Sequence, residues 1–166
     1  MDKIKKFVYF ILLILTLSIF IIGCSKSSSL EIDKYKNFAA EFKNFNYNIN
    51  FKDNISQLDD KSKKYLTDDE YGNFRKNRKL ELLLQIAQKN NLIISTTNPV
   101  IEKDKEYPDK IDFKYQMTIL MKNNKDKEYE IPIKGELTVI NQNKNTLKIS
   151  RDWDDFTNSI PKDLLN

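Results

Sequence analysis

The sequence contains no histidine, only one cysteine and only three glycines among its 166 residues. Without histidine the chain lacks the commonest general base, the commonest metal ligand and every catalytic triad that uses histidine. A single cysteine excludes internal disulfides and cysteine-cluster metal sites. We therefore predict no catalytic residue of these kinds, no metal site and no cofactor.

An excess of charge of one sign is also missing. Lys plus Arg number 28 and Asp plus Glu number 24, which gives a net charge of +4. The first 23 residues contain three Lys and one Asp, so the remainder carries only +2. Affinity for nucleic acid depends on a strongly basic surface, and a net charge this small does not indicate one. We therefore predict no nucleic-acid partner.

The N-terminus begins with a charged stretch and continues into an apolar run. Asp2-Lys3-Ile4-Lys5-Lys6 precedes the 16 residues Phe7–Ile22, which only Thr16 and Ser18 interrupt. A membrane-spanning helix needs about 20 apolar residues, whereas the apolar region of a secretory signal needs about 7–15. The length of the run favours a signal peptide.

The block that follows the run is Ile21-Ile22-Gly23-Cys24, and after it comes the polar stretch Ser25-Lys26-Ser27-Ser28-Ser29. This block resembles the lipobox of bacterial lipoproteins. The resemblance implies that a diacylglycerol is attached to the thiol of Cys24 and that a signal peptidase cuts between Gly23 and Cys24. The alternatives are an uncleaved anchor helix and an ordinary secretory signal.

We accordingly divide the chain into a lipoprotein signal peptide (1–23), a lipidated cysteine with a short tether (24–29) and one domain (30–166). The tether reaches at most about 17 Å, so the domain is expected close to the outer face of the cytoplasmic membrane. Its expected partners are membrane lipid, through acylated Cys24, and an envelope protein. Abundant Lys, Asn and Ile with few Gly and Arg favour a Gram-positive source.

The first part of the domain has helical periodicity. Apolar residues recur every three or four positions from Leu30 to about Phe45, and a short helix is expected over 56–65. Thr67-Asp68-Asp69-Glu70 has the pattern of a capping box, which predicts a long helix from there to about Lys89. Asn90-Asn91 is expected to close that helix.

From Leu92 onward the period changes to two, which predicts strands. We expect them over 92–101, 111–122, 129–139 and 147–153, with a turn at Asn123-Asn124-Lys125-Asp126. Pro132 and Gly135 lie inside the third strand. Because proline cannot donate to a sheet and glycine allows bending, we expect an edge position or a bulge there.

Helices followed by strands predict an α+β fold, with N-terminal helices packed on one face of a curved, roughly four-stranded antiparallel sheet. The order of elements, together with Leu147-Lys148-Ile149-Ser150-Arg151-Asp152-Trp153 as a closing strand, resembles the nuclear-transport-factor-2-like or cystatin-like superfamily. The resemblance covers about Leu30 to Trp153. It implies a bent sheet with helices in its concave side.

Enzymes of that superfamily often place a carboxylate and a tyrosine inside the cone, and strand alternation tests whether this chain does so. The alternation predicts no acid on the inner face, because it puts on the outer face Asp112, Glu128, Glu130, Glu136 and Asp152. It predicts on the inner face Tyr115, Tyr129, Arg151 and Trp153. Adding two helical tyrosines, the candidate pocket or partner-binding residues are Tyr35, Tyr71, Tyr115, Arg151 and Trp153. The plainer interpretations are that Trp153 fills the core and that Arg151 reaches water or a helix acid.

The acidic run Asp152-Trp153-Asp154-Asp155 invites comparison with calcium-binding loops. The pattern does not fit, because Phe156 occupies the fifth position and Thr157 the position that needs glycine. We interpret the run as a solvated turn.

The leading functional hypothesis is a lipid-anchored, non-catalytic accessory or binding domain at the cell envelope. The alternative is a small-ligand binder or uncommon hydrolase with a pocket between the long helix and the sheet. A third option is a protease inhibitor by analogy with cystatins, but the chain has no inhibitory-loop motif that would favour it.

Overall fold

The computed structural model describes residues 29–123, 128–143 and 146–165. The signal peptide, Cys24 and most of the expected turn at 123–126 lie outside the described residues. The helices are α2 (Ser29–Asn46), α3 (Ile55–Tyr65), α4 (Asp68–Asn77), α5 (Lys79–Asn90), α6 (Phe156–Ser159) and α7 (Lys162–Leu165). The strands are β1 (Ile49–Asn50), β2 (Leu92–Thr96), β3 (Val100–Glu106), β4 (Lys110–Asn123), β5 (Glu128–Gln142) and β6 (Thr146–Asp154).

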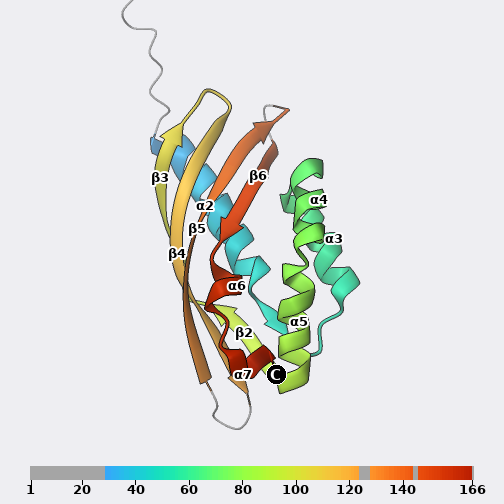
Figure 1. The fold of residues 1–166 in the computed structure, drawn as a ribbon. Helices are drawn as coiled ribbons and strands as arrows, with labels where there is room; N and C mark the ends of the chain where they lie inside the picture. The colour runs from blue at the N-terminus through green and yellow to red at the C-terminus, as the bar shows by residue number, and fades with distance from the viewer. Residues whose placement is uncertain (1–28, 124–127, 144–145, 166) are drawn as a thin grey trace, which may run out of the picture. The chain divides into compact units, whose positions relative to one another are not determined.

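All strand pairs are antiparallel, and the sheet has the order β1-β2-β4-β5-β6. Strand β3 also pairs with β4, along the half of β4 that β2 leaves open. The strands bend, and α2 to α5 all lie on one side of them (Figure 1). This confirms the predicted α+β fold with helices on one face of a curved antiparallel sheet.

The sheet has two more strands than expected, because β1 is new and the predicted strand over 92–101 is divided. Its two parts, β2 and β3, are joined by Thr97, Asn98 and Pro99. Thr97 exchanges hydrogen bonds with Thr118 of β4, through its backbone N–H at 2.9 Å and its Oγ1 at 2.9 Å. The connection therefore stays beside β4 without forming a ladder, and Pro99 has no N–H to extend one.

The predicted long helix is also divided. Arg78 has φ 50°, in the left-handed region, and separates α4 from α5. Thr67 caps α4 as expected, accepting from the backbone N–H of Glu70 at 3.3 Å. The reciprocal half of the predicted capping box is wrong, because the backbone N–H of Thr67 donates to the carbonyl of Ile149 instead. Asn91, at φ 51°, closes α5 as predicted.

One extra residue in β6 reverses the direction in which its second half faces. Val139 of β5 pairs with Ile149, but the preceding Thr138 pairs with Arg151, so Ser150 has no partner on β5. Because side chains alternate along a strand, such a bulge moves every later side chain to the opposite face. The predicted placement after the bulge is therefore wrong.

The exposures agree with this reversal. The side chains of Asp152 and Asp154 are 4% and 2% exposed, whereas the side chain of Arg151 is 58% exposed and Trp153 is 54% exposed. Trp153 does not fill the core, Arg151 is not on the inner face, and the acidic run is not a solvated turn.

The prediction for Pro132 and Gly135 is partly right. Strand β5 lies between β4 and β6 only as far as Gly135, which pairs with Asp154. Pro132 lies beyond that point and pairs only with Thr118 of β4, so it occupies a local edge. The irregularity between β5 and β6 is at Ser150, not within β5.

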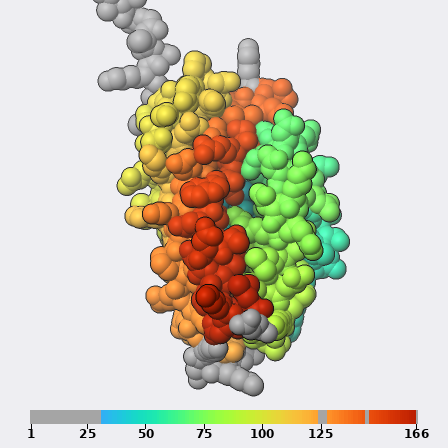
Figure 2. Space-filling view, viewed as in Figure 1, coloured from blue at the N-terminus to red at the C-terminus, as the bar shows by residue number. Residues whose placement is uncertain are grey.

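The C-terminal residues close the end of β5 that β6 does not reach. Phe156, Ile160 and Leu164 are buried, and the hydroxyl of Tyr129 donates to Asp163 at 2.7 Å. In Figure 2 these red residues lie between the orange strands and the green helices. Among the described helices, none has the length and apolar character needed to cross a membrane.

Candidate functional site

Two features of the structure are candidate sites, and they lie on opposite faces of strand β6. The first is a buried cluster of charges around Asp154. Its Oδ2 accepts hydrogen bonds from Lys79 Nζ at 2.7 Å, from the hydroxyls of Tyr47 at 2.7 Å and Tyr115 at 2.9 Å, and from Lys43 Nζ at 3.3 Å. Its Oδ1 accepts from the backbone N–H of Phe156 at 3.3 Å. Both oxygens of the carboxylate are thus occupied by donors.

Two lysines balance Asp154 and Asp152. Lys43 comes from α2, is fully buried and pairs with both acids. Lys79 is the first residue of α5 and also pairs with both, at 2.7 Å from Asp154 and 3.8 Å from Asp152. Lys43 Nζ lies 4.3 Å from the ring centroid of Tyr115, and Lys79 Nζ lies 5.0 Å from that of Tyr47. Each ammonium therefore contacts both a carboxylate and an aromatic face.

The pKa directions follow from this pairing. Burial by itself raises the pKa of Asp154, but Lys43 and Lys79 hold it well below its usual range. Burial by itself lowers the pKa of Lys79, but Asp152 and Asp154 raise it above its usual value. Burial and the neighbouring acids raise the pKa of both Tyr47 and Tyr115. At neutral pH Lys79 and Asp154 are therefore charged, and the hydroxyls of Tyr47 and Tyr115 are neutral.

Glu70 of α4 contacts β6 next to this cluster, at the edge of the strand that does not pair with β5. Its Oε1 accepts from the backbone N–H of Asp152 at 2.9 Å, and its Oε2 accepts from the side chain of Asn73 at 3.3 Å. Burial raises the pKa of Glu70, while these two hydrogen bonds oppose the rise. Glu70 thus attaches helix α4 to the free edge of β6, just past the bulge.

A polar pocket of about 280 Å³ opens onto the cluster between β6 and the α4–α5 junction. It is lined by Glu70, Phe74, Asn77, Lys79, Asp152, Trp153, Asp154 and Thr157. This corrects the expectation that no acid lies inside the fold. The acids are present, but paired lysines and hydroxyls already satisfy them, and this arrangement suits structural stabilisation more than proton transfer. Within the described residues, no set of His, Cys, Asp or Glu side chains is arranged to hold a metal ion.

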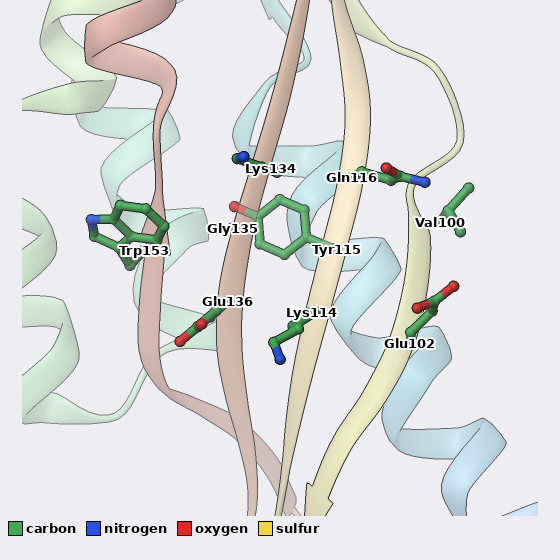
Figure 3. Close-up of a pocket in the computed structure, with 9 residues that line it drawn as sticks. All are labelled: Val100, Glu102, Lys114, Tyr115, Gln116, Lys134, Gly135, Glu136 and Trp153. Atoms are coloured by element: carbon green, nitrogen blue, oxygen red, sulfur yellow. The ribbon is translucent and has the colours of Figure 1, made fainter.

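The second feature is a groove on the outer face of the sheet, away from the helices. Its volume is about 350 Å³. Trp153 stands on one side and Val100 on the other, with Gly135 and Tyr115 in the floor between them (Figure 3). Charged and amide side chains complete the lining, namely Glu102, Lys114, Gln116, Lys134 and Glu136.

Gly135 lies between the buried cluster and the outer groove. It pairs with Tyr115 on β4 and with Asp154 on β6. A Cβ at this position would collide with the backbone oxygen of Trp153 and lie 2.6 Å from the hydroxyl of Tyr115. Only glycine therefore leaves room on the inner face for the Tyr115 side chain to pass over β5, so that its hydroxyl reaches Asp154.

The predicted candidate residues divide between these surroundings. Tyr115 and Trp153 both line the outer groove, although Tyr115 is buried and bonds inward. Arg151 pairs with Glu136 at 3.0 Å on the outer face, and not with a helix acid. Tyr71 donates to Asp59 at 2.7 Å on the helical side, and Tyr35 is buried in α2. The structure brings Tyr115 and Trp153 together and leaves the other three apart from them.

Sequence reasoning missed the centre of the buried cluster, which is formed by Lys43, Tyr47, Lys79 and Asp154. One signal was available. Lys43 stands four residues after Ala39 and one after Phe42, so it belongs to the apolar stripe of its helix. A lysine inside such a stripe requires an acid on the facing surface.

No protein-family model matches the sequence, and no curated protein matches it at a significant level. The fold is similar to that of an IcmL-like type IV secretion system protein from Legionella pneumophila, with a TM-score of 0.60, 17% identity, and coverage of 71% of this chain and 87% of that chain. It is also similar to a periplasmic fragment of TraM, with a TM-score of 0.57, 11% identity, and coverage of 72% and 93%. At such low identity these similarities establish the fold alone.

Proposed function

We propose that this chain is a lipoprotein, anchored at the outer face of the cytoplasmic membrane through acylated Cys24, whose domain is a non-catalytic binding module for another envelope protein. The observation that carries the anchoring is the coincidence of a basic start, an apolar run, Gly23 and the only cysteine of the chain. The domain would then work within reach of the tether that follows Cys24.

The fold supports the second half of the proposal. One similar structure is described as a type IV secretion system protein and the other as a periplasmic fragment. Both descriptions agree with a role outside the cytoplasm, and the first with a role among assembled envelope proteins. The same fold hosts many activities, so the chemistry of the site must support the choice.

The buried cluster agrees with a non-catalytic role. General acid–base catalysis needs a group that can exchange a proton near the working pH. Asp154 is held charged by two lysines, and Tyr47 and Tyr115 are held neutral. Among the described residues, the most exposed aromatic residue is instead Trp153 on the outer face, and tryptophan is a residue type that often anchors protein interfaces.

The anchoring is tested by Cys24→Ser in the full-length protein expressed in a Gram-positive host. We expect the variant to incorporate no labelled fatty acid and to keep its signal peptide, because serine has no thiol to accept the diacylglycerol. Ser27→Ala, in the adjacent tether, is the matched control and is expected to be labelled and processed normally. Normal labelling of Cys24→Ser would refute the anchor.

A second candidate function is supported by the polar pocket between β6 and the α4–α5 junction. This site is close to the alternative expected from the sequence, a small-ligand or hydrolase pocket between the long helix and the sheet. If this pocket binds a small ligand, that ligand should raise the thermal unfolding temperature of the wild-type protein but not that of Lys79→Met. A metabolite screen with this readout that finds no such ligand removes this candidate.

A further inference from the structure

Two of the exposed large apolar side chains on the described surface lie in the same groove. The large hydrophobic side chains that are exposed are those of Ile93, Val100, Tyr107, Trp153 and Leu165. The two most exposed, Trp153 at 54% and Val100 at 53%, face each other across the same outer groove. An exposed apolar pair with polar neighbours is the composition typical of an interaction site.

The register of the sheet fixes how the groove's charges are arranged. One row across the outer face runs Trp153, Glu136, Lys114 and Glu102, and the next runs Lys134, Gln116 and Val100. The apolar side chains therefore occupy one diagonal of the groove. Lys134 and Glu102 occupy the other, as Figure 3 shows.

Those two charged side chains remain open for a partner. Lys114 pairs with Asp104 at 2.8 Å, and Glu136 pairs with Arg151 at 3.0 Å. Among the described residues, no ion pair is formed by Glu102 or by Lys134. An occupant that places an apolar side chain between Trp153 and Val100 thus meets a positive charge on one side and a negative charge on the other.

The groove continues into a second hollow of about 450 Å³, with which it shares Val100, Gln116 and Lys134. This second hollow extends along β4 and β5 to Thr97 and Pro132. Together the two hollows follow the strands past the end of β6. This length suits an extended chain segment better than a compact small molecule.

We propose that the outer groove binds an extended segment of a partner protein that places an aromatic or large aliphatic side chain between Trp153 and Val100, with an acidic residue beside Lys134 and a basic residue beside Glu102. This inference rests on the proposed binding role and names its surface and the chemistry of its partner. Opposite charges on the two sides fix which segments fit, and the apolar contact supplies most of the affinity.

The test uses the full chain in detergent micelles and three synthetic peptides of about ten residues, a length that spans an extended groove. Each peptide has a central Phe, and its flanks are one acid and one base, two acids, or two bases. Trp153 is the only tryptophan, so its fluorescence reports occupation of the groove directly. A version of the mixed peptide with Ala for Phe, and an N-acetylglucosamine oligosaccharide, complete the set.

We expect the mixed peptide to shift the emission of Trp153 to shorter wavelength in a saturable way. Replacing its Phe by Ala should weaken binding at least about tenfold, since buried aromatic anchors dominate such contacts. Val100→Ser should also weaken binding, whereas Ile93→Ser, at an exposed residue outside the groove, should not. Glu102→Lys should transfer the preference to the peptide with two acids, and Lys134→Glu to the peptide with two bases.

Three results would overturn the inference. They are no fluorescence change with any peptide up to its solubility limit, a change only with the oligosaccharide, and a charge preference that neither Glu102→Lys nor Lys134→Glu alters. Each would remove the groove as a protein-binding surface. The anchoring through Cys24 is judged separately by fatty-acid labelling, so failure of one proposal is distinguishable from failure of the other.

Discussion

Residues 151–154 of β6 divide between two environments that differ in almost every property. On the inner face, the side chains of Asp152 and Asp154 are buried, lysines pair with both, and two tyrosine hydroxyls donate to Asp154. On the outer face, Arg151 and Trp153 are exposed, and Arg151 makes one ion pair open to solvent. The same four residues thus contribute stability through one face and the proposed binding surface through the other, and the extra residue Ser150 determines which side chains lie on which face.

The two faces should respond differently to mutation. Removing one partner of a buried ion pair leaves an uncompensated charge in a medium of low polarity, whereas an exposed pair contributes little. Substitutions on the inner face should therefore change the free energy of unfolding. Substitutions on the outer face should change binding and leave that free energy nearly unaltered.

The largest effect is expected for Lys43→Met. Methionine fills a similar volume but leaves Asp152 without its closest partner, so we expect a loss of about 3–5 kcal/mol from the free energy of unfolding. Urea denaturation followed by circular dichroism measures it. Lys103→Met removes a more exposed lysine that pairs with Glu106, and it serves as the control with an expected change close to zero. Equal effects of the two substitutions would mean that the inner cluster has no special role in stability.

A smaller effect is expected at the glycine between the two faces. Gly135→Ala puts a Cβ against the backbone of Trp153 and the hydroxyl of Tyr115, so we expect a destabilisation of about 1–3 kcal/mol. Gly72→Ala, in α4, meets no atom within 4 Å and should stabilise by about 0.5–1 kcal/mol. The same substitution thus changes the free energy of unfolding in opposite directions at the two positions, and thermal unfolding of both variants measures this. If Gly135→Ala were as stable as wild type, Tyr115 would not pass β5 as described.

The smallest effect concerns pH. Burial raises the pKa of Glu70, and an acid whose pKa rises on folding stabilises the fold below its ordinary pKa and loses that contribution as the pH rises. As the pH rises above about 4.5, Glu70 therefore lowers the free energy of unfolding, and Glu70→Gln should lack this contribution. Asp154, whose pKa is lowered, acts in the opposite direction and only at more acidic pH, where its protonation removes stability.

Unfolding free energies of wild type and Glu70→Gln, measured at a series of pH values, provide this comparison. Asp69→Asn changes the neighbouring exposed acid of the same helix and is the control. A constant difference between wild type and Glu70→Gln across the range would show that Glu70 does not titrate there, against the expected contribution of its burial.

The sequence was sufficient for most of the residues of α2 to α5 and for most of the sheet, but not for the break between α4 and α5 or for α6 and α7. Apolar spacing predicted α2, the Thr67 cap predicted the start of α4, and alternation predicted β4, β5 and the first half of β6. These features depend on local propensity and on which face is buried, and both can be read from neighbouring residues. The left-handed residue Arg78 was not predictable, because arginine carries no preference for that conformation.

The candidate site was not predictable for a related reason. Alternation assigns faces correctly only while the register continues, and Ser150 gives no sign of a bulge in its own identity. Arg151 and Trp153 were therefore predicted inside, and Asp152 outside. The lysine in the apolar stripe of α2 was the contrary signal, but its partners lie 109 and 111 positions later in the chain, and only the folded sheet brings them together.

The reversal at Ser150 is tested most directly by the accessibility of Trp153, the only tryptophan. Acrylamide quenching of its fluorescence in the native protein should proceed at about half the rate found for the urea-unfolded chain or faster, because the indole is about half exposed on the outer face. A native protein whose tryptophan resists quenching would place Trp153 inside, and with it would contradict the buried positions of Asp152 and Asp154.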